Sequence, residues 1–274
     1  MSLYATTAPA STATLISKKN NQSTITMRYF MRLSFRGEHF HGWQSQPHDI
    51  SVQETVEKVL STLLRTPTSI TGAGRTDAKV NAKMMIAHFD ADQPIADTAK
   101  LIHSMNGILD RDVAIHAIFP VHDTAHARFD ATSRTYKYFA HTEKSPFLYP
   151  LSWRCQPWLD FELMNEAASH LMTYTDFTSF SKLHTDVATN NCKVTEAHWD
   201  KLDDCQWVFT ITADRFLRNM VRAIVGTLTD VGNHKITVEQ FCRIIEEKNR
   251  CSAGTSMPGH ALYLWNITYP YPIF

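Results

Sequence analysis

The sequence predicts an α+β fold built from two similar halves, and three observations lead to it. Apolar residues alternate along some short segments, as in strands, and recur every three or four positions along others, as in helices. The order strand, helix, strand, strand, helix, strand occurs over 27–120 and again over 121–274. This is the order of a ferredoxin-like, or RRM-like, unit with an antiparallel sheet and helices on one face. We therefore expect two antiparallel sheets joined around a central cleft.

The first half contains each element of this unit in turn. Apolar and polar residues alternate over 31–35, which predicts a strand. Ser51 and Glu54 have the spacing of a capping box, and an apolar face follows them, so a helix is expected to begin there. The remaining elements are expected as strands near 68–71 and 84–89, a helix over 97–109, and a strand over 113–119 in which every second residue is apolar.

The second half repeats the order with one additional helix. Its elements are expected as a strand over 133–141, a helix over 160–173, strands near 192–200 and 206–213, helices over 215–231 and 237–248, and a strand over 262–269. Proline, histidine and aspartate cluster between 120 and 130, which marks the junction of the halves. Because ligand sites favour such junctions, a functional site is expected in the cleft between them.

Composition narrows the class of protein. The chain has 274 residues, 43% of them hydrophobic, with 27 basic and 27 acidic residues, so any basic surface must be local. Five cysteines without a C-x-x-C pair fit neither a disulfide framework nor a zinc site and favour a reducing compartment. No apolar run approaches the roughly 20 residues of a membrane span. We expect a cytoplasmic protein with a disordered N-terminal extension over 1–26, which is rich in Ser, Thr and Ala.

The segment GAGRTDAKVNAK, residues 72–83, is the first candidate for a functional site. It lacks the apolar periodicity of a helix or strand, and its two glycines permit close approaches that a side chain would block. Asp77 is therefore displayed on a loop among Arg75, Lys79 and Lys83. An aspartate satisfied by nearby backbone amides, with solvated cations around it, is the structural alternative to a functional carboxylate.

A basic stripe in the segment ADRFLRNMVRAIVG is the second candidate. Arg215, Arg218 and Arg222 are three and four residues apart, so they are expected on one side of a helix. A solvated helix face is the simpler interpretation. Arg222, however, lies between Val221 and Ile224, where an unpaired guanidinium would be costly to bury and a carboxylate partner is expected. Asp77 is a candidate for that partner.

The segment HARFDATSRTYKYF is the third candidate, because it mixes cations with aromatic residues. Its cations are Arg128, Arg134 and Lys137, and its aromatic side chains include Tyr136 and Tyr138. Cations that neutralise phosphates beside rings that stack on bases are typical of proteins that bind single-stranded or looped RNA. The alternative is an ordinary strand with both tyrosines in the core and Lys137 on the opposite face.

Histidines raise a weaker possibility, a metal site. His39 and His41 are two residues apart on an extended segment, and His126 is a conceivable third ligand. Separated histidines without a third ligand at a fixed spacing are more often exposed or hydrogen-bonded.

Seven motifs in a fixed order make the sequence similar to the bacterial tRNA pseudouridine synthase A family. They are HGWQSQP (41–47), SVQE (51–54), GAGRTDA (72–78), HARFDATSRTYKY (126–138), DFTSF (176–180), NMVRAIVG (219–226) and LYL (262–264). The resemblance covers the chain from about Tyr29 to Tyr269. GAGRTDA is the most specific of these motifs, and their common order makes a chance match improbable.

The resemblance implies a homodimer that isomerises uridine to pseudouridine in the tRNA anticodon arm, at positions 38, 39 and 40, without a cofactor or metal. It implies that Asp77 is catalytic, that Arg75 helps to flip the target base, that Tyr136 stacks on the uracil and that Arg222 pairs with Asp77. The residues expected to bind substrate are Arg75, Lys79, Lys83, Arg128, Arg134, Lys137, Arg215, Arg218 and Leu262.

Departures from the family pattern leave an alternative open. Lys79 and Asn81 stand where the family usually has glycine and histidine, and Ala261 stands where a glycine commonly precedes the LYL motif. These changes concern the geometry of the loop and its RNA contacts, and neither removes Asp77, Arg222 or Tyr136. A catalytically idle protein that binds tRNA or another RNA on the same scaffold is the competing hypothesis. The sequence also does not distinguish attack by the Asp77 carboxylate on the ring or sugar from removal of a sugar proton.

Overall fold

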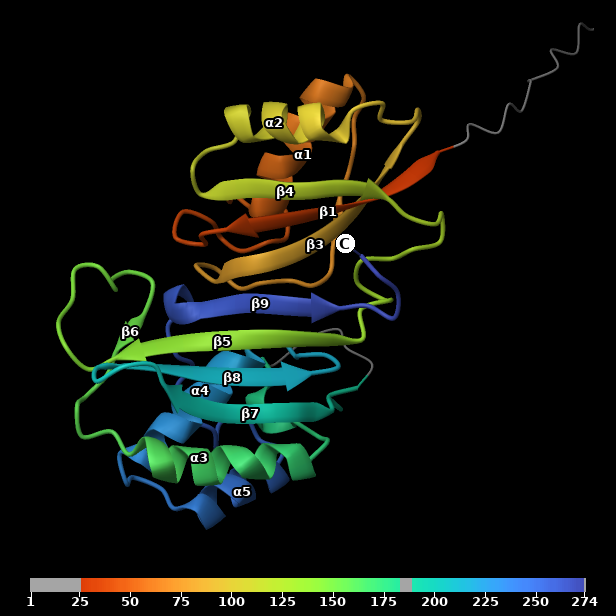
Figure 1. Ribbon diagram of the computed structural model, residues 1–274. Helices are drawn as coiled ribbons and strands as arrows, with labels where there is room; N and C mark the ends of the chain where they lie inside the picture. The colour runs from red at the N-terminus through yellow and green to blue at the C-terminus, as the bar shows by residue number, and fades with distance from the viewer. Residues whose placement is uncertain (1–25, 183–188, 274) are drawn as a thin grey trace, which may run out of the picture.

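Strands from both halves of the chain join into one nine-stranded sheet in this computed structural model (Figure 1). The structure describes residues 26–182 and 189–273, so the expected N-terminal extension lies, but for its last residue, outside the described part. The strands are β1 (Met27–Phe35), β2 (Thr71–Gly72), β3 (Asn81–Ala91), β4 (Val113–Pro120), β5 (Ser133–His141), β6 (Trp153–Arg154), β7 (Val194–Lys201), β8 (Gln206–Ala213) and β9 (Leu262–Thr268). The mixed α+β class is confirmed.

The expectation of two antiparallel sheets is wrong, because β9 has hydrogen-bonded neighbours on both edges and makes the strands of both halves one sheet. The strand order is β4-β1-β3-β9-β5-β8-β7, with β2 beside β3 and β6 beside β5. β9 runs antiparallel to β5 in its own half and parallel to β3 in the other, with Asn81 opposite Tyr263 and Ala82 opposite Leu264. Side-chain periodicity predicts which face of a strand is buried, but it carries no information about which edges pair.

Within the described residues five α-helices accompany the sheet, and α1 and α4 lie behind the strands in Figure 1. They are α1 (Val52–Leu64), α2 (Thr98–Ile108), α3 (Phe161–Ser169), α4 (Met220–Gly232) and α5 (Val238–Glu246). The expected cap of α1 is present, since the Ser51 side chain accepts a hydrogen bond from the Glu54 amide. At α5, Thr237 and Gln240 form a reciprocal capping box. Helix starts with such side-chain signals were therefore predicted well.

β4 departs from the simple alternation expected over 113–119. Arg32 of β1 faces Ala117 and the next residue, Leu33, faces Ile115, so His116 is an extra residue that bulges from the ladder. Beyond the bulge the buried side chain is Ile118, where alternation had predicted Ala117 and Phe119. One inserted residue reverses the faces of a strand because the side-chain period is two.

Two apolar clusters form the core, and β9 contributes to both. Leu262 belongs to the cluster of the C-terminal half, whereas Leu264 and Ile267 belong to that of the N-terminal half. Tyr136 of β5 packs against both clusters. The seam between the halves is therefore part of the packed interior.

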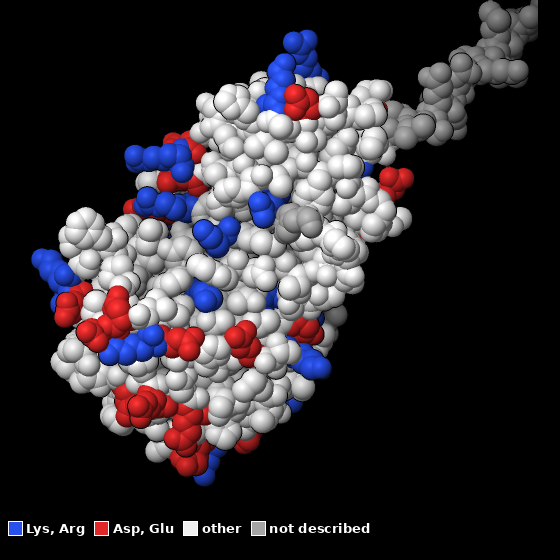
Figure 2. Space-filling model, in the orientation of Figure 1, with Lys and Arg blue, Asp and Glu red and all other residues white. Residues whose placement is uncertain are grey.

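Charge is unevenly distributed on the face seen in Figure 2. Lysine and arginine side chains are spread over its middle, and acidic side chains gather toward the lower end, where α3 and β7 lie. A zero formal charge for the whole chain is thus compatible with local basic surfaces. Over the part of the chain that the structure describes, no helix is both long and apolar enough to span a bilayer.

Candidate active site

The GAGRTDA loop, residues 72–78, is held by backbone contacts to the segment that precedes α1. The amide of Trp43 donates to the carbonyl of Thr76 at 3.3 Å, and the amide of Lys79 donates to the carbonyl of Phe40 at 3.2 Å. Gly72 faces the Trp43 indole, where a Cβ atom would lie 2.5 Å from the ring, so only glycine fits without a shift. Gly74 has open space at the same position. The expected reason for a glycine therefore applies to Gly72 alone.

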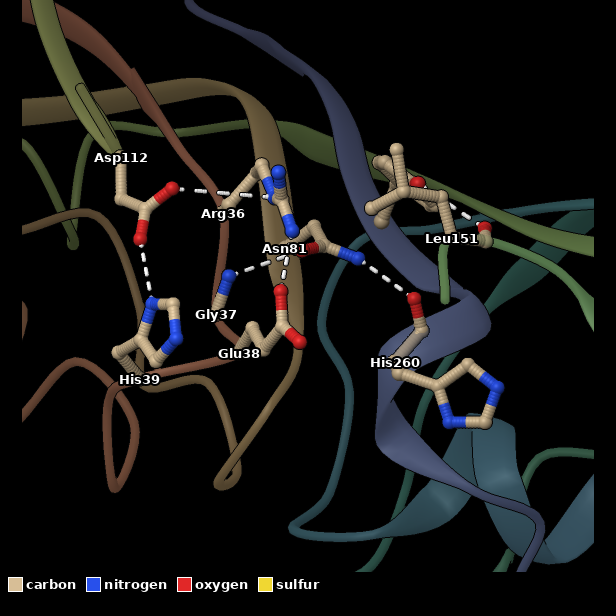
Figure 3. Close-up of polar contacts among 9 residues, drawn as sticks. Arg36, Gly37, Glu38, His39, Asn81, Asp112, Leu151 and His260 are labelled. Carbon is tan, nitrogen blue, oxygen red and sulfur yellow. Dashed lines mark hydrogen bonds and ion pairs between the residues drawn. The ribbon is translucent and has the colours of Figure 1, made fainter. Parts of the chain in front are cut away.

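Lys79 and Asn81, the two departures from the family pattern, both have a structural explanation. Lys79 keeps a left-handed backbone, with a φ angle of 64°, so the conformation that glycine favours is retained with a lysine. Asn81 is buried and bridges two segments (Figure 3): its Oδ1 accepts from the Gly37 amide at 2.8 Å and its Nδ2 donates to the His260 carbonyl at 2.7 Å. Asn81 thus ties the start of β3 to the turn before β9.

Asp77 lies across the seam from Arg222, which is on α4. Nη1 of Arg222 is 3.2 Å from Oδ2 of Asp77, and Nε of Arg218 is 3.7 Å from Oδ1. The Asp77 and Arg222 side chains are 21% and 22% exposed, so the pair is largely withdrawn from water. Nε of Arg222 also donates to the carbonyl of Met257 at 2.5 Å. The expected ion pair is therefore present, and the guanidinium is anchored on both sides.

Arg215 and Arg218 do not lie on a helix, contrary to the prediction of one helix over 215–231. Asn219 has a φ angle of 69°, and α4 begins only at Met220. The Asp214 side chain accepts hydrogen bonds from the amides of Lys193 and Arg215, which fixes the preceding loop. A local side-chain-to-backbone arrangement of this kind competes with helix formation. Arg218 reaches Asp77 from this loop.

Tyr136 lies at the same seam, with its ring packed edge-on against Phe216 at a centroid distance of 4.9 Å. Burial raises the pKa of its hydroxyl to about 12, with a smaller raising effect from Asp77 and a lowering effect from Arg134. The phenol is therefore neutral at physiological pH, and it can offer a ring face or a hydrogen bond but not a phenolate base.

Arg75 and Arg128 line one small pocket of about 100 Å³ beside the loop. Trp43, Gln44 and Gly72 also line it. Both arginines are exposed, and Arg128 lies 5.7 Å from the ring centre of Phe129, which is 75% exposed. This edge of the site has the cations and aromatic surface that unpaired nucleotides favour.

Four of the residues expected to bind substrate make contacts other than those expected of a substrate-binding side chain. Lys137 lies over the Trp265 ring at 5.0 Å, and neighbouring strand residues face opposite ways, so it points away from Tyr136. Lys83 lies near His116 of β4, whose pKa is lowered by burial first, then by Arg32 and Lys83. Leu262 is only 5% exposed and belongs to the core. Arg134 donates four hydrogen bonds to backbone carbonyls.

The histidines considered for a metal site are not brought together. Nδ1 of His39 lies 2.6 Å from Asp112, as Figure 3 shows, and Nδ1 of His41 lies 3.6 Å from Asp49. His126 instead packs against His88, with ring centres 4.6 Å apart. Within 26–182 and 189–273 no cluster of three or more potential metal ligands occurs.

Two contacts of the site were missed by sequence reasoning. Phe216, which packs against Tyr136, lies in the segment ADRFLRNMVRAIVG, of which only the arginines were considered, and the Met257 carbonyl that binds Arg222 comes from a segment without a polar motif. The aromatic residue next to Arg215 was a visible signal, whereas a backbone carbonyl has no signature in a sequence.

A carboxylate held by two arginines, beside a neutral tyrosine and exposed cations at the seam of a mixed sheet, fits the class of enzymes that modify RNA. Comparisons identify the family. A family model described as tRNA pseudouridine synthase matches residues 167–270. The chain is 56% identical over 247 residues to the tRNA pseudouridine synthase A of Parabacteroides distasonis, which covers 90% of this chain and 98% of the relative. The chain therefore belongs to the tRNA pseudouridine synthase A family.

Two further relatives show how far the similarity extends. The tRNA pseudouridine synthase A of Bacteroides fragilis is 55% identical over 247 residues, covering 90% of this chain and 98% of the relative. That of Bacillus subtilis is 37% identical over 251 residues, covering 89% and 99%. The resemblance first indicated by the motifs is confirmed along nearly the whole described chain, and the family is one of isomerases that form pseudouridine in tRNA.

Proposed function

We propose that this chain converts uridine to pseudouridine in the anticodon stem-loop of tRNA, at positions 38, 39 and 40, with Asp77 as the catalytic group. The observation that carries the proposal is the ion pair between Asp77 of the GAGRTDA loop and Arg222 of the other half. A catalytically idle RNA-binding protein would have no need to bury a carboxylate and a guanidinium together at some cost in desolvation. The retained pair and the family membership do not favour that alternative.

The reaction is an isomerisation, so atoms balance within the substrate. The bond between N1 of uracil and C1′ of ribose breaks, the bond between C5 and C1′ forms, the C5 proton leaves and N1 gains a proton. A fixed carboxylate serves each route, as a nucleophile on the ring or sugar or as a base for a sugar proton. Arg222 and Arg218 hold the carboxylate in one orientation.

Side chains around the Asp77 carboxylate are suited to the other steps, which are holding the detached uracil, flipping the base and binding phosphates. The neutral Tyr136 ring beside Asp77 is suited to hold the detached uracil by stacking. The target base must leave its stack, which costs a few kcal/mol, and the proposal is that Arg75, which lines the pocket beside the loop, occupies the vacancy. Lys79, Arg128, Arg215 and Arg218 are the proposed phosphate contacts, since they belong to segments around this seam.

Other features of the proposal follow from the family resemblance. We propose a cytoplasmic homodimer that needs no cofactor or metal. We also propose that 27–120 and 121–274 are ferredoxin-like halves. The spatial orders β4-β1-β3-β2 and β9-β5-β8-β7 support this, because in each half the fourth strand of the unit lies beside the first and the third beside the second. Light scattering of the purified chain tests the dimer.

The substrate assignment is tested with three transcribed tRNAs that carry uridine at position 38, 39 or 40 alone, labelled with tritium at C5. Formation of pseudouridine releases this label into water, so release from each tRNA reports turnover at one position. A matched tRNA with cytidine at all three positions should release none. No release from any of the three tRNAs would overturn the proposed function, and release from only some would correct the set of positions.

A further inference from the structure

The side chain of Arg134, on β5, donates hydrogen bonds to backbone carbonyls of three separate segments. Nη1 donates to Ala131 and Asp214, each at 2.8 Å, and Nη2 donates to Arg128 at 2.6 Å and to Ala73 at 3.1 Å. These four bonds account for the four N–H groups of the two terminal nitrogens. A guanidinium engaged in this way has no terminal donor left for a phosphate.

The three segments are the ones that build the active site. Ala73 belongs to the GAGRTDA loop, which carries Asp77. Arg128 and Ala131 belong to the loop over 126–131, which provides a wall of the pocket beside Arg75. Asp214 begins the loop that carries Arg218 and leads to Arg222. One side chain therefore ties both partners of the Asp77–Arg222 pair to a common strand.

The burial and charge of Arg134 support a fixed role for its side chain inside the protein. Burial lowers the pKa of Arg134, with Tyr269 and Tyr136 acting in the opposite direction. The side chain remains charged at physiological pH, since an arginine starts near 12.5. Hydrogen bonds from a charged donor to carbonyls are stronger than neutral ones, so the four contacts are rigid restraints.

We propose that Arg134 is a positioning residue that sets the distance between the catalytic loop and the arginines facing it, and that it does not bind RNA phosphate. This inference rests on the proposed function, because it concerns the geometry of Asp77 in that reaction. It replaces the expectation that Arg134 belongs to the basic surface for substrate.

The test compares Arg134→Gln with Arg128→Gln, which removes the same charge from an exposed arginine six residues away. Single-turnover rates, the KM for tRNA, the dependence of tRNA affinity on salt and the thermal midpoint are measured for both variants and the unmodified chain. For Arg134→Gln we expect a rate lower by roughly tenfold to a hundredfold, since misplacement by about 1 Å has that effect. Its KM should stay within about threefold and its salt slope unchanged. Arg128→Gln should reduce the slope by about one.

A second readout does not depend on activity. Amide hydrogen exchange should accelerate over 72–78, 126–131 and 214–219 in Arg134→Gln, while α1 keeps its protection. Arg134→Lys, which keeps the charge but cannot reach four carbonyls, should give an intermediate effect and serves if the glutamine variant does not fold. A salt slope reduced by one in Arg134→Gln, or unchanged exchange together with an unchanged rate, would overturn the inference. Absence of turnover in the unmodified chain would count against the proposed function alone, because the exchange result still tests Arg134.

Discussion

Asp77 and Arg222 illustrate how two residues far apart in the sequence can each require the other. Arg222 is flanked by the buried residues Val221 and Ala223, so its guanidinium would be left without an oppositely charged partner if the carboxylate were absent. The two charged groups meet at 3.2 Å, and Met257 accepts a further hydrogen bond from Arg222. This pairing was predictable from the sequence because a charge in an apolar stretch needs a partner.

Replacing Arg222 tests the importance of that pairing. Arg222→Leu should lower the single-turnover rate about a hundredfold, because it removes one member of a mostly buried pair and frees the carboxylate to move. Arg222→Lys keeps the charge without the planar, two-pronged geometry and should show a smaller loss. The rates are measured at saturating enzyme, so weaker binding does not contribute. A fully active Arg222→Leu enzyme would show that the pair is not needed for the reaction.

The left-handed backbone conformation of Lys79 lowers the stability of the fold, and this effect can be measured. A non-glycine residue in the left-handed region costs about 1–2 kcal/mol, partly offset because glycine loses more entropy on folding. Lys79→Gly should therefore raise the free energy of unfolding by about 0.5–1 kcal/mol, read from urea titrations. Lys83→Gly is the matched control, since Lys83 lies within β3, where glycine should destabilise by about the same amount. Destabilisation by Lys79→Gly would contradict this account of the loop.

Some helices and strands were predicted more accurately than others, and the difference has a physical reason. β5 and β8 occur over the predicted residues, and α1 and α5 begin at their predicted caps. The start of α4 was wrong, because the left-handed Asn219 stops a helix that apolar periodicity alone would extend. Alternation and capping are local, so a sequence reports them; bulges and left-handed residues depend on surrounding contacts.

The loop over 126–131 is attached to the sheet through His88 of β3, which makes its attachment sensitive to pH. Nδ1 of His88 accepts a hydrogen bond from the Ala127 amide at 3.2 Å. Burial, together with the nearby Arg28 and His126, lowers the pKa of His88 to about 4, although Asp90 and Asp130 act in the opposite direction. The folded state therefore holds His88 neutral, whereas the unfolded chain protonates it near pH 6.5.

The free energy of unfolding should consequently decrease as the pH is lowered from about 6.5 to about 4. In this range the unfolded chain binds a proton on His88 that the folded chain does not. Between pH 7 and pH 5 the contribution of His88 amounts to about 2 kcal/mol. Urea unfolding at both pH values should show a smaller loss for His88→Gln, which cannot be protonated but can still accept the hydrogen bond. An equal loss in the variant and the unmodified chain would show that other groups control the acid sensitivity.

At the scale of the whole molecule, one continuous sheet brings the site together. β9 joins the halves, and Asp77 from one half meets Arg218 and Arg222 from the other. The sequence predicted the members of this group through their motifs and through the cost of a buried charge. It did not predict that Lys137 and Lys83 lie apart from it, because a cluster of cations along the chain does not show which face each one occupies.

The central claim, that Asp77 performs the chemistry and phosphate contacts hold the tRNA, is tested most directly by Asp77→Asn. Asparagine keeps the shape of the side chain but can act neither as a nucleophilic carboxylate nor as a base. Tritium release from C5-labelled tRNA in a single turnover should fall roughly a thousandfold or more. The Kd for the same tRNA should change by less than about tenfold, because phosphate contacts supply most of the affinity. A rate within about tenfold of the unmodified chain would contradict the assignment of Asp77 as the catalytic group.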